Sequence, residues 1–110
     1  MRSVTKLYLY DGDTKFFGEG PYRLLCGIER TGSLRKAAFE MELSYSKAIS
    51  IIARAEQVLG FALTAKKTGG KGGGGSTLTA EAKQFIEKYE KYREACYEAN
   101  AAIYNEIFSE

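Results

Sequence analysis

The pattern of apolar and polar positions predicts extended segments at two places in the chain. Near the start, the β-forming residues of 6–10 and 14–17 flank Asp11-Gly12-Asp13, a typical turn sequence. Further on, residues 61–67 have the composition of a strand, and residues 77–78 resemble a short returning strand. The sequence therefore predicts two small hairpins.

Between these hairpins, apolar residues recur at helical spacing in three successive segments, 21–31, 34–41 and 45–59. Pro21 suits the first position of a helix, where its missing N–H has no intrahelical partner. Ser33 and Ser44 stand where N-caps are expected, and Gly32 and Gly60 stand where left-handed glycines end helices. The middle of the chain is therefore predicted to be three helices in close succession.

Thr79 is the predicted N-cap of a last helix that runs from Ala80 nearly to the C-terminus. Thirty helical residues would span about 45 Å, whereas a domain of about 100 residues has a radius of gyration of about 13 Å. We expect the helix to outrun its domain and its heptad-like apolar seam to face a second copy of the chain. The alternatives are a helix that folds back on its own domain or breaks near Asn100. The residues of the seam taken for dimerisation are Phe85, Tyr89, Tyr92, Cys96, Ala99 and Ile103.

Composition narrows the possible functions. The chain has 110 residues, 45% of them hydrophobic, which suits one domain with a core. Histidine is absent, and Cys26 and Cys96 cannot complete a zinc site alone, so no metal and no cofactor are expected. Two reduced thiols are favoured over a disulfide. Neither a signal peptide nor an apolar run long enough for a membrane is present, which favours a cytoplasmic protein.

Catalysis is not expected either, because the acidic residues are scattered and no nucleophile has a neighbouring base in a recognisable motif.

The net charge of +2 conceals a division along the chain. Residues 1–19 are neutral, residues 20–78 carry a net charge of +5, and residues 79–110 carry a net charge of −3. The middle segment therefore has the basic excess expected of a surface that binds nucleic acid. The acidic excess lies on the last helix, which would point away from the nucleic acid.

The order of elements is that of a winged helix-turn-helix, a mainly α fold with small β hairpins. In this arrangement the helix at 44–59 enters the DNA major groove, and its polar stripe (Ser46, Ser50, Arg54 and Gln57, with Lys47 adjoining) faces the DNA. A polar face is also what any surface helix shows. The candidate DNA-binding residues on the two central helices are Ser33, Arg35, Lys36, Ser44, Tyr45, Ser46, Lys47, Ser50 and Arg54.

The most unusual segment is the loop at 68–76, in which six of residues 69–75 are glycine and the seventh is Lys71. It does not match a phosphate-binding P-loop, which needs G-x-x-x-x-G-K-[ST]. A hairpin tip, or wing, fits better, because glycines let backbone N–H groups approach phosphates. A solvated loop is the alternative. The candidate DNA contacts of the wing are Lys66, Lys67, Thr68, Gly69, Gly70 and Lys71.

These motifs resemble a known family. Gly32-Ser33-Leu34, Ala37-Ala38, Ser44-Tyr45 and, above all, Thr68-Gly69-Gly70-Lys71-Gly72-Gly73-Gly74-Gly75 are similar to the N-terminal DNA-binding domain of the molybdate-responsive (ModE) regulators, distant relatives of LysR-type regulators. The resemblance covers roughly residues 18–90. It implies a winged helix-turn-helix dimer on a palindromic operator, with a recognition helix that opens at Ser44, Tyr45, Ser46 and Lys47 and with the 68–76 loop as the wing.

The chain departs from the family pattern at three places. Ile49 follows Ala48 where the family usually has Trp, and Lys66-Lys67 replace a Glu-Arg pair before the glycine string. Both changes bear on the operator sequence. Full-length members also carry domains that bind molybdate or tungstate, and because the chain ends at Glu110 no such site is expected on it.

The sequence thus predicts a homodimeric transcriptional regulator of double-stranded DNA, cytoplasmic and associated with the nucleoid. Its parts would be a winged helix-turn-helix domain at 1–78 and a dimerisation helix at 79–110; the first comprises a hairpin at 4–17, a helix-turn-helix at 33–59 and a wing at 61–78. A protein-interaction module on the same scaffold and an architectural DNA binder without sequence preference remain alternatives.

Overall fold

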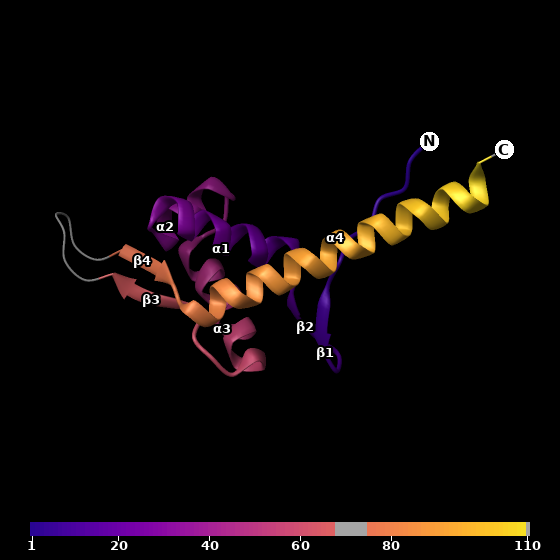
Figure 1. Ribbon diagram of the computed structural model, residues 1–110. Coiled ribbons are helices and arrows are strands. Elements are labelled where there is room, and N and C mark those ends of the chain that lie inside the picture. Colours follow the sequence, from indigo (N-terminus) through magenta and orange to yellow (C-terminus); the bar gives the residue numbers. More distant parts are fainter. Residues whose placement is uncertain (68–74, 110) are drawn as a thin grey trace.

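The computed structural model describes residues 1–67 and 75–109. It is a small, mainly helical domain with two β-hairpins and a long C-terminal helix (Figure 1). Its elements, in chain order, are β1 (Leu9–Asp11), β2 (Thr14–Phe17), α1 (Glu19–Thr31), α2 (Leu34–Glu40), α3 (Tyr45–Leu59), β3 (Thr64–Lys67), β4 (Gly75–Leu78) and α4 (Ala80–Phe108).

The N-terminal hairpin forms where the turn sequence predicts it, with shorter strands. β1 and β2 are antiparallel, and Tyr10 pairs with Lys15. The register shifts within β1, between Leu9 and Tyr10. The residues before Leu9, which the composition had predicted as strand, lie outside the ladder, because β2 ends at Phe17, the partner of Leu9. Phe17, at the end of β2, is buried in the core and ties the hairpin to the helices.

Helix α1 begins at Glu19, two residues earlier than predicted. Pro21 is therefore its third residue, which the helix tolerates because none of its first four N–H groups has an intrahelical partner. The Tyr22 N–H donates to the carbonyl of Gly18, 3.0 Å away, and closes the first turn. At the other end Gly32 adopts a φ of 72° and ends the helix as the sequence predicts.

The three predicted N-caps are confirmed. The hydroxyl oxygens of Ser33, Ser44 and Thr79 each accept a hydrogen bond from the backbone N–H three residues later, at 3.0–3.1 Å. Gly60 ends α3 with a φ of 82°. The predicted bounds of α3 and α4 hold because these hydrogen bonds are local in the chain.

The second hairpin pairs β3 with β4, from Thr64 opposite Leu78 to Lys67 opposite Gly75. Residues 61–63, predicted as part of a strand, precede the ladder instead. β4 is fastened to the end of α1, because the Ser76 N–H donates to the carbonyl of Gly32 at 2.9 Å. A side chain at Gly75 would collide with that carbonyl.

The core brings all four helices and both hairpins together. Leu24, Leu25 and Ile28 of α1 are fully buried, and the first half of α4 covers them with Ala82, Phe85, Ile86 and Tyr89. Phe17 meets the rings of Phe85 and Tyr89 edge-on, with centroids 4.8 and 4.9 Å apart. Two residues of the predicted dimerisation seam therefore pack against their own domain: Tyr89 is buried and Phe85 is partly buried.

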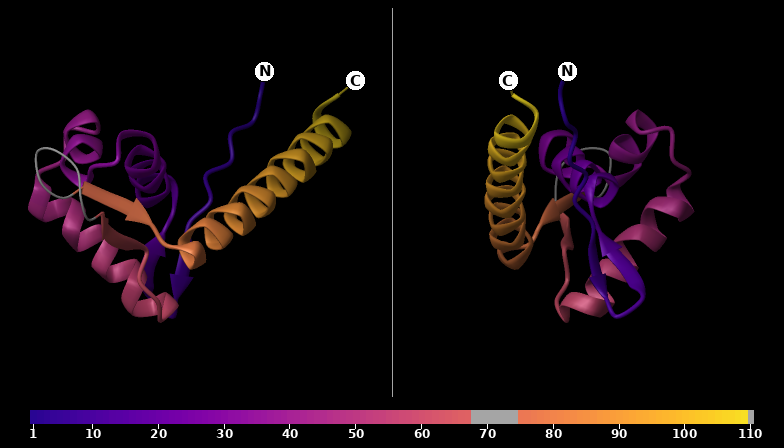
Figure 2. Two further views of the ribbon diagram at one scale, coloured as in Figure 1. Left: turned by 60° about the vertical axis from the view of Figure 1, so that its left-hand side comes forward. Right: turned by 90° about the vertical axis from the view of Figure 1, so that its right-hand side faces the viewer.

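The second half of α4 extends beyond the rest of the molecule (Figures 1 and 2). The protein measures 61 × 28 × 24 Å, so the expectation that this helix outruns its domain is confirmed. It stays continuous through Asn100, whose side chain donates a hydrogen bond to the Thr5 hydroxyl. The N-terminal segment is thereby tied to the protruding part of the helix.

Candidate nucleic-acid interface

The two central helices are joined by a four-residue turn, residues 41–44. The backbone of this turn is held by the Leu43 N–H, which donates to the carbonyl of Ala38 at 2.9 Å. Glu42 has a φ of 58°, a conformation that non-glycine residues seldom adopt. The turn therefore has a defined geometry, and it fixes the direction in which α3 leaves α2.

Helix α3 buries one face and exposes the opposite one. Ala48, Ile52 and Ala55 are buried against the other helices. The residues directly opposite recur at spacings of four and three, which places them on one stripe. This outer stripe consists of Ser46, Ser50, Ala53 and Gln57, all exposed.

Cations stand on the flank of α3 that faces the N-terminal hairpin. Lys47, Ile51 and Arg54 line a pocket together with Lys15 of β2. The sequence pattern placed Arg54 on the outer stripe. In the structure Arg54 is exposed and borders that stripe beside Ala53, and it also lines this pocket. The four residues that define the outer stripe are themselves uncharged.

The other flank of α3 meets α2 through a cation–π contact. The guanidinium carbon of Arg35 lies 4.0 Å from the centroid of the Tyr45 ring. Tyr45 is 40% exposed and Arg35 is exposed as well, so the pair borders the outer stripe from the side of α2. The stripe thus has cations on both sides.

Ser33 and Ser44, which the sequence put forward as DNA contacts, have structural tasks as caps. Their oxygens accept the N–H groups of Lys36 and Lys47. The Ser33 hydroxyl proton stays available to donate to an outside acceptor such as a phosphate oxygen, whereas the Ser44 hydroxyl also lies 3.4 Å from the Ser46 hydroxyl. The Lys36 side chain is exposed at the start of α2.

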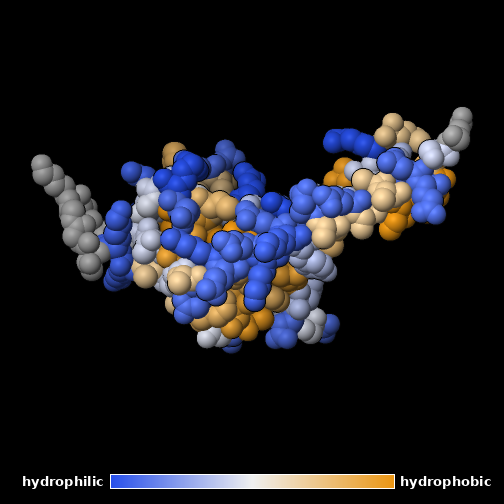
Figure 3. Space-filling view, in the orientation of Figure 1, coloured by the Kyte–Doolittle hydropathy of each residue, from blue (hydrophilic) through white to orange (hydrophobic). Residues whose placement is uncertain are grey.

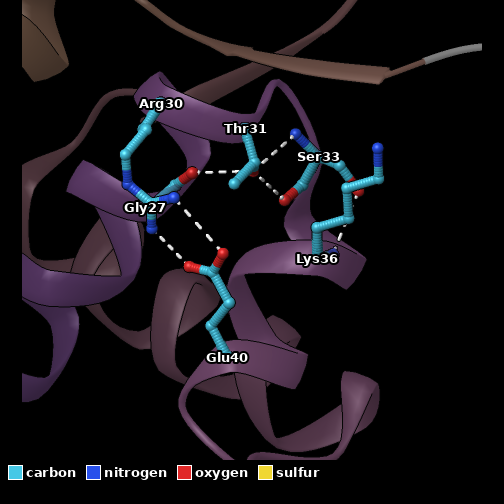
Figure 4. Close-up of polar contacts among 6 residues, drawn as sticks. All are labelled: Gly27, Arg30, Thr31, Ser33, Lys36 and Glu40. Atoms are coloured by element: carbon cyan, nitrogen blue, oxygen red, sulfur yellow. Dashed lines mark hydrogen bonds and ion pairs between the residues drawn. The ribbon is translucent and has the colours of Figure 1, made fainter.

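The junction of α1 and α2 is braced by polar contacts (Figure 4). The hydroxyl of Thr31 donates to the carbonyl of Gly27 at 2.7 Å and accepts the N–H of Ser33 at 3.2 Å. Arg30 holds both carboxylate oxygens of Glu40, and this hydrogen-bonded pairing lowers the pKa of Glu40. These contacts orient α2 on α1.

The second hairpin carries two of the predicted contacts at its base. Lys66 and Lys67 lie on β3 with exposed side chains. Thr68, Gly69, Gly70 and Lys71, which complete the predicted wing, lie outside the described residues.

The structure also adds residues that the sequence analysis missed. Lys15 and Tyr8 lie beside Lys47 and Arg54 along the hairpin flank of α3. No local motif marks either residue, because their place depends on how β2 packs against α3, about thirty positions further along the chain.

In residues 1–67 and 75–109, no three His, Cys, Asp or Glu side chains gather as they would to hold a metal ion. The helices described there all lack an apolar stretch of the length that a membrane crossing needs.

Taken together, the fold and the polar face define a small helical domain that presents one helix, flanked by cations, to solvent. Comparison with known proteins shows a similarity over part of the chain. Between 60 and 67% of the chain is homologous to the N-terminal region of ModE-type proteins. No family model matches.

Three relatives carry this similarity. The chain is 38% identical over 74 residues to the molybdenum transport protein ModE of Herbaspirillum seropedicae. It is 34% identical over 68 residues to the transcriptional regulator ModE of Haemophilus influenzae. It is 38% identical over 66 residues to the molybdenum-pterin-binding protein MopB of Rhodobacter capsulatus. The matches cover 67, 62 and 60% of this chain and 26, 27 and 24% of the relatives, so the chain spans about a quarter of their length.

Proposed function

We propose that this protein is a DNA-binding transcriptional regulator with a winged helix-turn-helix fold, in which α2 and α3 form the helix-turn-helix and β3–β4 form the base of the wing. The observation that carries the proposal is the uncharged, hydrogen-bonding outer stripe of α3 with cations on both flanks. Base edges are read by neutral hydrogen-bonding groups as well as by cations, whereas phosphates attract cations. The similarity to the transcriptional regulator ModE of Haemophilus influenzae supports the same function.

In this proposal α3 lies in the major groove. Ser46, Ser50 and Gln57 meet base edges, and Gln57 is suited to adenine, to which a glutamine amide can bind bidentately. Lys47 and Arg54 on one flank and Arg35 on the other meet phosphates of the two strands that border the groove. Lys66 and Lys67, at the base of the wing, contact the neighbouring phosphates of the DNA backbone.

The second half of α4 supplies the proposed dimer contact. With Phe85 and Tyr89 in the core, the seam begins at Tyr92 and runs through Cys96, Ala99 and Ile103 to Ile107, which extends it by one turn. Tyr92 and Ile103 are each 53% exposed and Ile107 is 66% exposed. Figure 3 shows apolar residues along this protruding part of the molecule. A second copy of the helix would cover them.

We therefore assign different functions to the two parts of the chain. Residues 1–78 bind DNA, and residues 79–110 join two copies, although the first half of α4 also completes the core. A symmetric dimer reads a pseudo-palindromic operator whose half-sites are separated by one DNA turn, about 34 Å, or by a multiple of it. The cytoplasmic, nucleoid-associated location remains part of the proposal.

The test is selection of bound duplexes from a random DNA pool, followed by titration of the selected and a scrambled duplex. We expect a pseudo-palindromic consensus and selective binding that weakens steeply as salt rises. Equal binding to both duplexes would favour the architectural alternative. If neither duplex shifts at low salt, the protein-interaction alternative holds and the proposal is wrong.

A further inference from the structure

A pocket of about 240 Å³ lies between the N-terminal hairpin and α3. Its apolar lining includes Phe16 and Phe17 of β2 and Ile51 of α3, and its polar lining includes Lys15, Lys47 and Arg54. β2 and α3 are in direct contact, so the three cations come from two elements that the fold holds together. The pocket adjoins the outer stripe of α3.

The charges around this pocket have one sign. Among the described residues that line it, none is acidic. Lys15, Lys47 and Arg54 are exposed, and none of them forms an ion pair with another residue in the described ranges. Three cations that border one small hollow repel one another, and an anion bound among them would relieve that repulsion.

Lys15 is held in place by a contact of its own. Its ammonium nitrogen lies 4.8 Å from the centroid of the Tyr8 ring, within the range of a cation–π contact. The Tyr8 ring in turn packs against Gly18, where an added Cβ would come within 2.8 Å of it. A cation restrained in this way loses less conformational freedom when it binds an anion.

We propose that the N-terminal hairpin is a further DNA-contacting element, in which Lys15 joins Lys47 and Arg54 around one backbone phosphate beside the groove that α3 enters. This inference rests on the proposed function. A duplex seated on the outer stripe of α3 runs a row of phosphates along each flank of the helix, and the pocket lies on one of these flanks. The apolar lining accommodates the sugar next to that phosphate.

The contact is confined to the side of the hairpin that faces α3. The turn carries Asp11 and Asp13, neither of which lines the pocket, and their charges oppose an approach of the hairpin tip to phosphates. The DNA therefore meets β2 at Lys15 and passes the tip at a distance.

The experiment compares DNA binding by the full chain and by Lys15→Ala, Lys15→Arg and Lys91→Ala in fluorescence-anisotropy titrations between about 0.05 and 0.2 M salt. Lys91 is exposed on α4 and provides the same change of net charge away from the pocket. We expect Lys15→Ala to weaken DNA binding about five- to tenfold at about 0.1 M salt and to leave base preference unchanged. The plot of log K against log salt should become less steep by about 1, because one phosphate contact is lost. Lys15→Arg and Lys91→Ala should retain the wild-type slope.

The outcomes separate the two proposals. If the wild-type protein binds DNA and Lys15→Ala keeps both its affinity and its salt slope, the hairpin contact is wrong and the proposed function stands. If the wild-type protein binds no DNA, both the hairpin contact and the proposed function are wrong. Lys15→Gln, which keeps the stem of the side chain, replaces Lys15→Ala if thermal unfolding shows that the alanine variant is not folded; the same expectations apply to it.

Discussion

The guanidinium of Arg93 lies 2.8 Å from a carboxylate oxygen of Glu19, across 74 positions of the chain. The same guanidinium lies over the ring of Tyr22, 4.4 Å from its centroid, and donates to the Tyr22 hydroxyl at 3.4 Å. Tyr22 donates in turn to Glu90 at 2.5 Å. These contacts fasten the middle of α4 to the start of α1 and so set the direction in which the long helix leaves the domain.

Replacement of Arg93 should therefore destabilise the fold. The Arg93 side chain is 21% exposed, and burial opposes its charge, but the hydrogen bonds to Glu19 and Tyr22 outweigh burial and hold its pKa above the usual value. We expect Arg93→Ala to lower the free energy of unfolding by about 1–2 kcal/mol, through lost packing as well as lost hydrogen bonds. Urea denaturation measures this. Lys91→Ala, on the polar face of the same helix, should change it by less than about 0.5 kcal/mol; equal losses would contradict the assignment.

The bond from Tyr22 to Glu90 predicts a dependence of stability on high pH. This hydrogen bond and then burial raise the pKa of Tyr22 from 10.0 to about 12. Because folding favours the protonated phenol, its contribution is complete below pH 10 and is lost as the pH rises towards about 12.

We expect Tyr22→Phe to cost about 1 kcal/mol near neutral pH, a value reduced by solvent screening, and to cost progressively less above pH 10. Denaturant unfolding of both proteins across this pH range measures the difference between their free energies of unfolding. Groups that titrate alike in both proteins do not contribute to this difference. A cost that stays constant with pH would show that the phenol proton is not involved.

Gly27 allows α1 and α2 to cross closely. A Cβ at Gly27 would lie 2.9 Å from the Cβ of Ala37, which the backbone holds in place. We expect Gly27→Ala to destabilise the protein by about 1–2 kcal/mol, because the strain exceeds the gain in helix propensity. Gly20 lies in the same helix, and a Cβ added there would have no other atom within 4 Å. Gly20→Ala should therefore be neutral or should stabilise the protein by up to about 1 kcal/mol. Thermal unfolding of the pair tests this, and a stabilised Gly27→Ala would refute it.

The positions of Gln57 and Lys47 on α3 predict two different defects in DNA binding. Gln57 lies on the outer stripe, so Gln57→Ala should cost about 1–3 kcal/mol on the selected operator and relax the preference at one base pair. Lys47 lies on the flank, so Lys47→Ala should weaken all duplexes alike and lower the salt slope by about 1. Titration of the operator and its single-base variants distinguishes the two. The reverse pattern would mean that α3 docks on DNA with a different rotation.

The exposed seam of α4 predicts where dimerisation can be blocked. We expect Ile103→Lys to turn a dimer into a monomer at micromolar concentration, because it places a charge in the apolar contact. Asn105→Lys adds the same charge to the opposite face of the helix and should leave the dimer intact. Sedimentation velocity measures both. A wild-type monomer at this concentration would overturn the proposed dimer, and a dimeric Ile103→Lys protein would place the contact elsewhere.

The sequence alone predicted most element boundaries, because caps and turns are made by residues close together in the chain. Ser33, Ser44 and Thr79 accept hydrogen bonds from N–H groups three positions away, and Gly32 and Gly60 supply the left-handed conformations that end α1 and α3. The strand limits were less accurate, because pairing depends on a partner strand: β1 begins only at Leu9, opposite Phe17, the last residue of β2.

Only the tertiary structure decided which side chains of each helix are buried and which charged side chains lie together. The apolar spacing of α4 is one continuous seam in the sequence, yet Phe85 and Tyr89 are taken into the core because Phe17 packs against them. Lys47 and Arg54 likewise belong to a polar stripe in the sequence, and they border a basic pocket because β2 brings Lys15 beside them. Helical periodicity fixes the spacing of side chains along a helix, but burial and charge clusters depend on segments far apart in the chain, whose packing the local pattern does not encode.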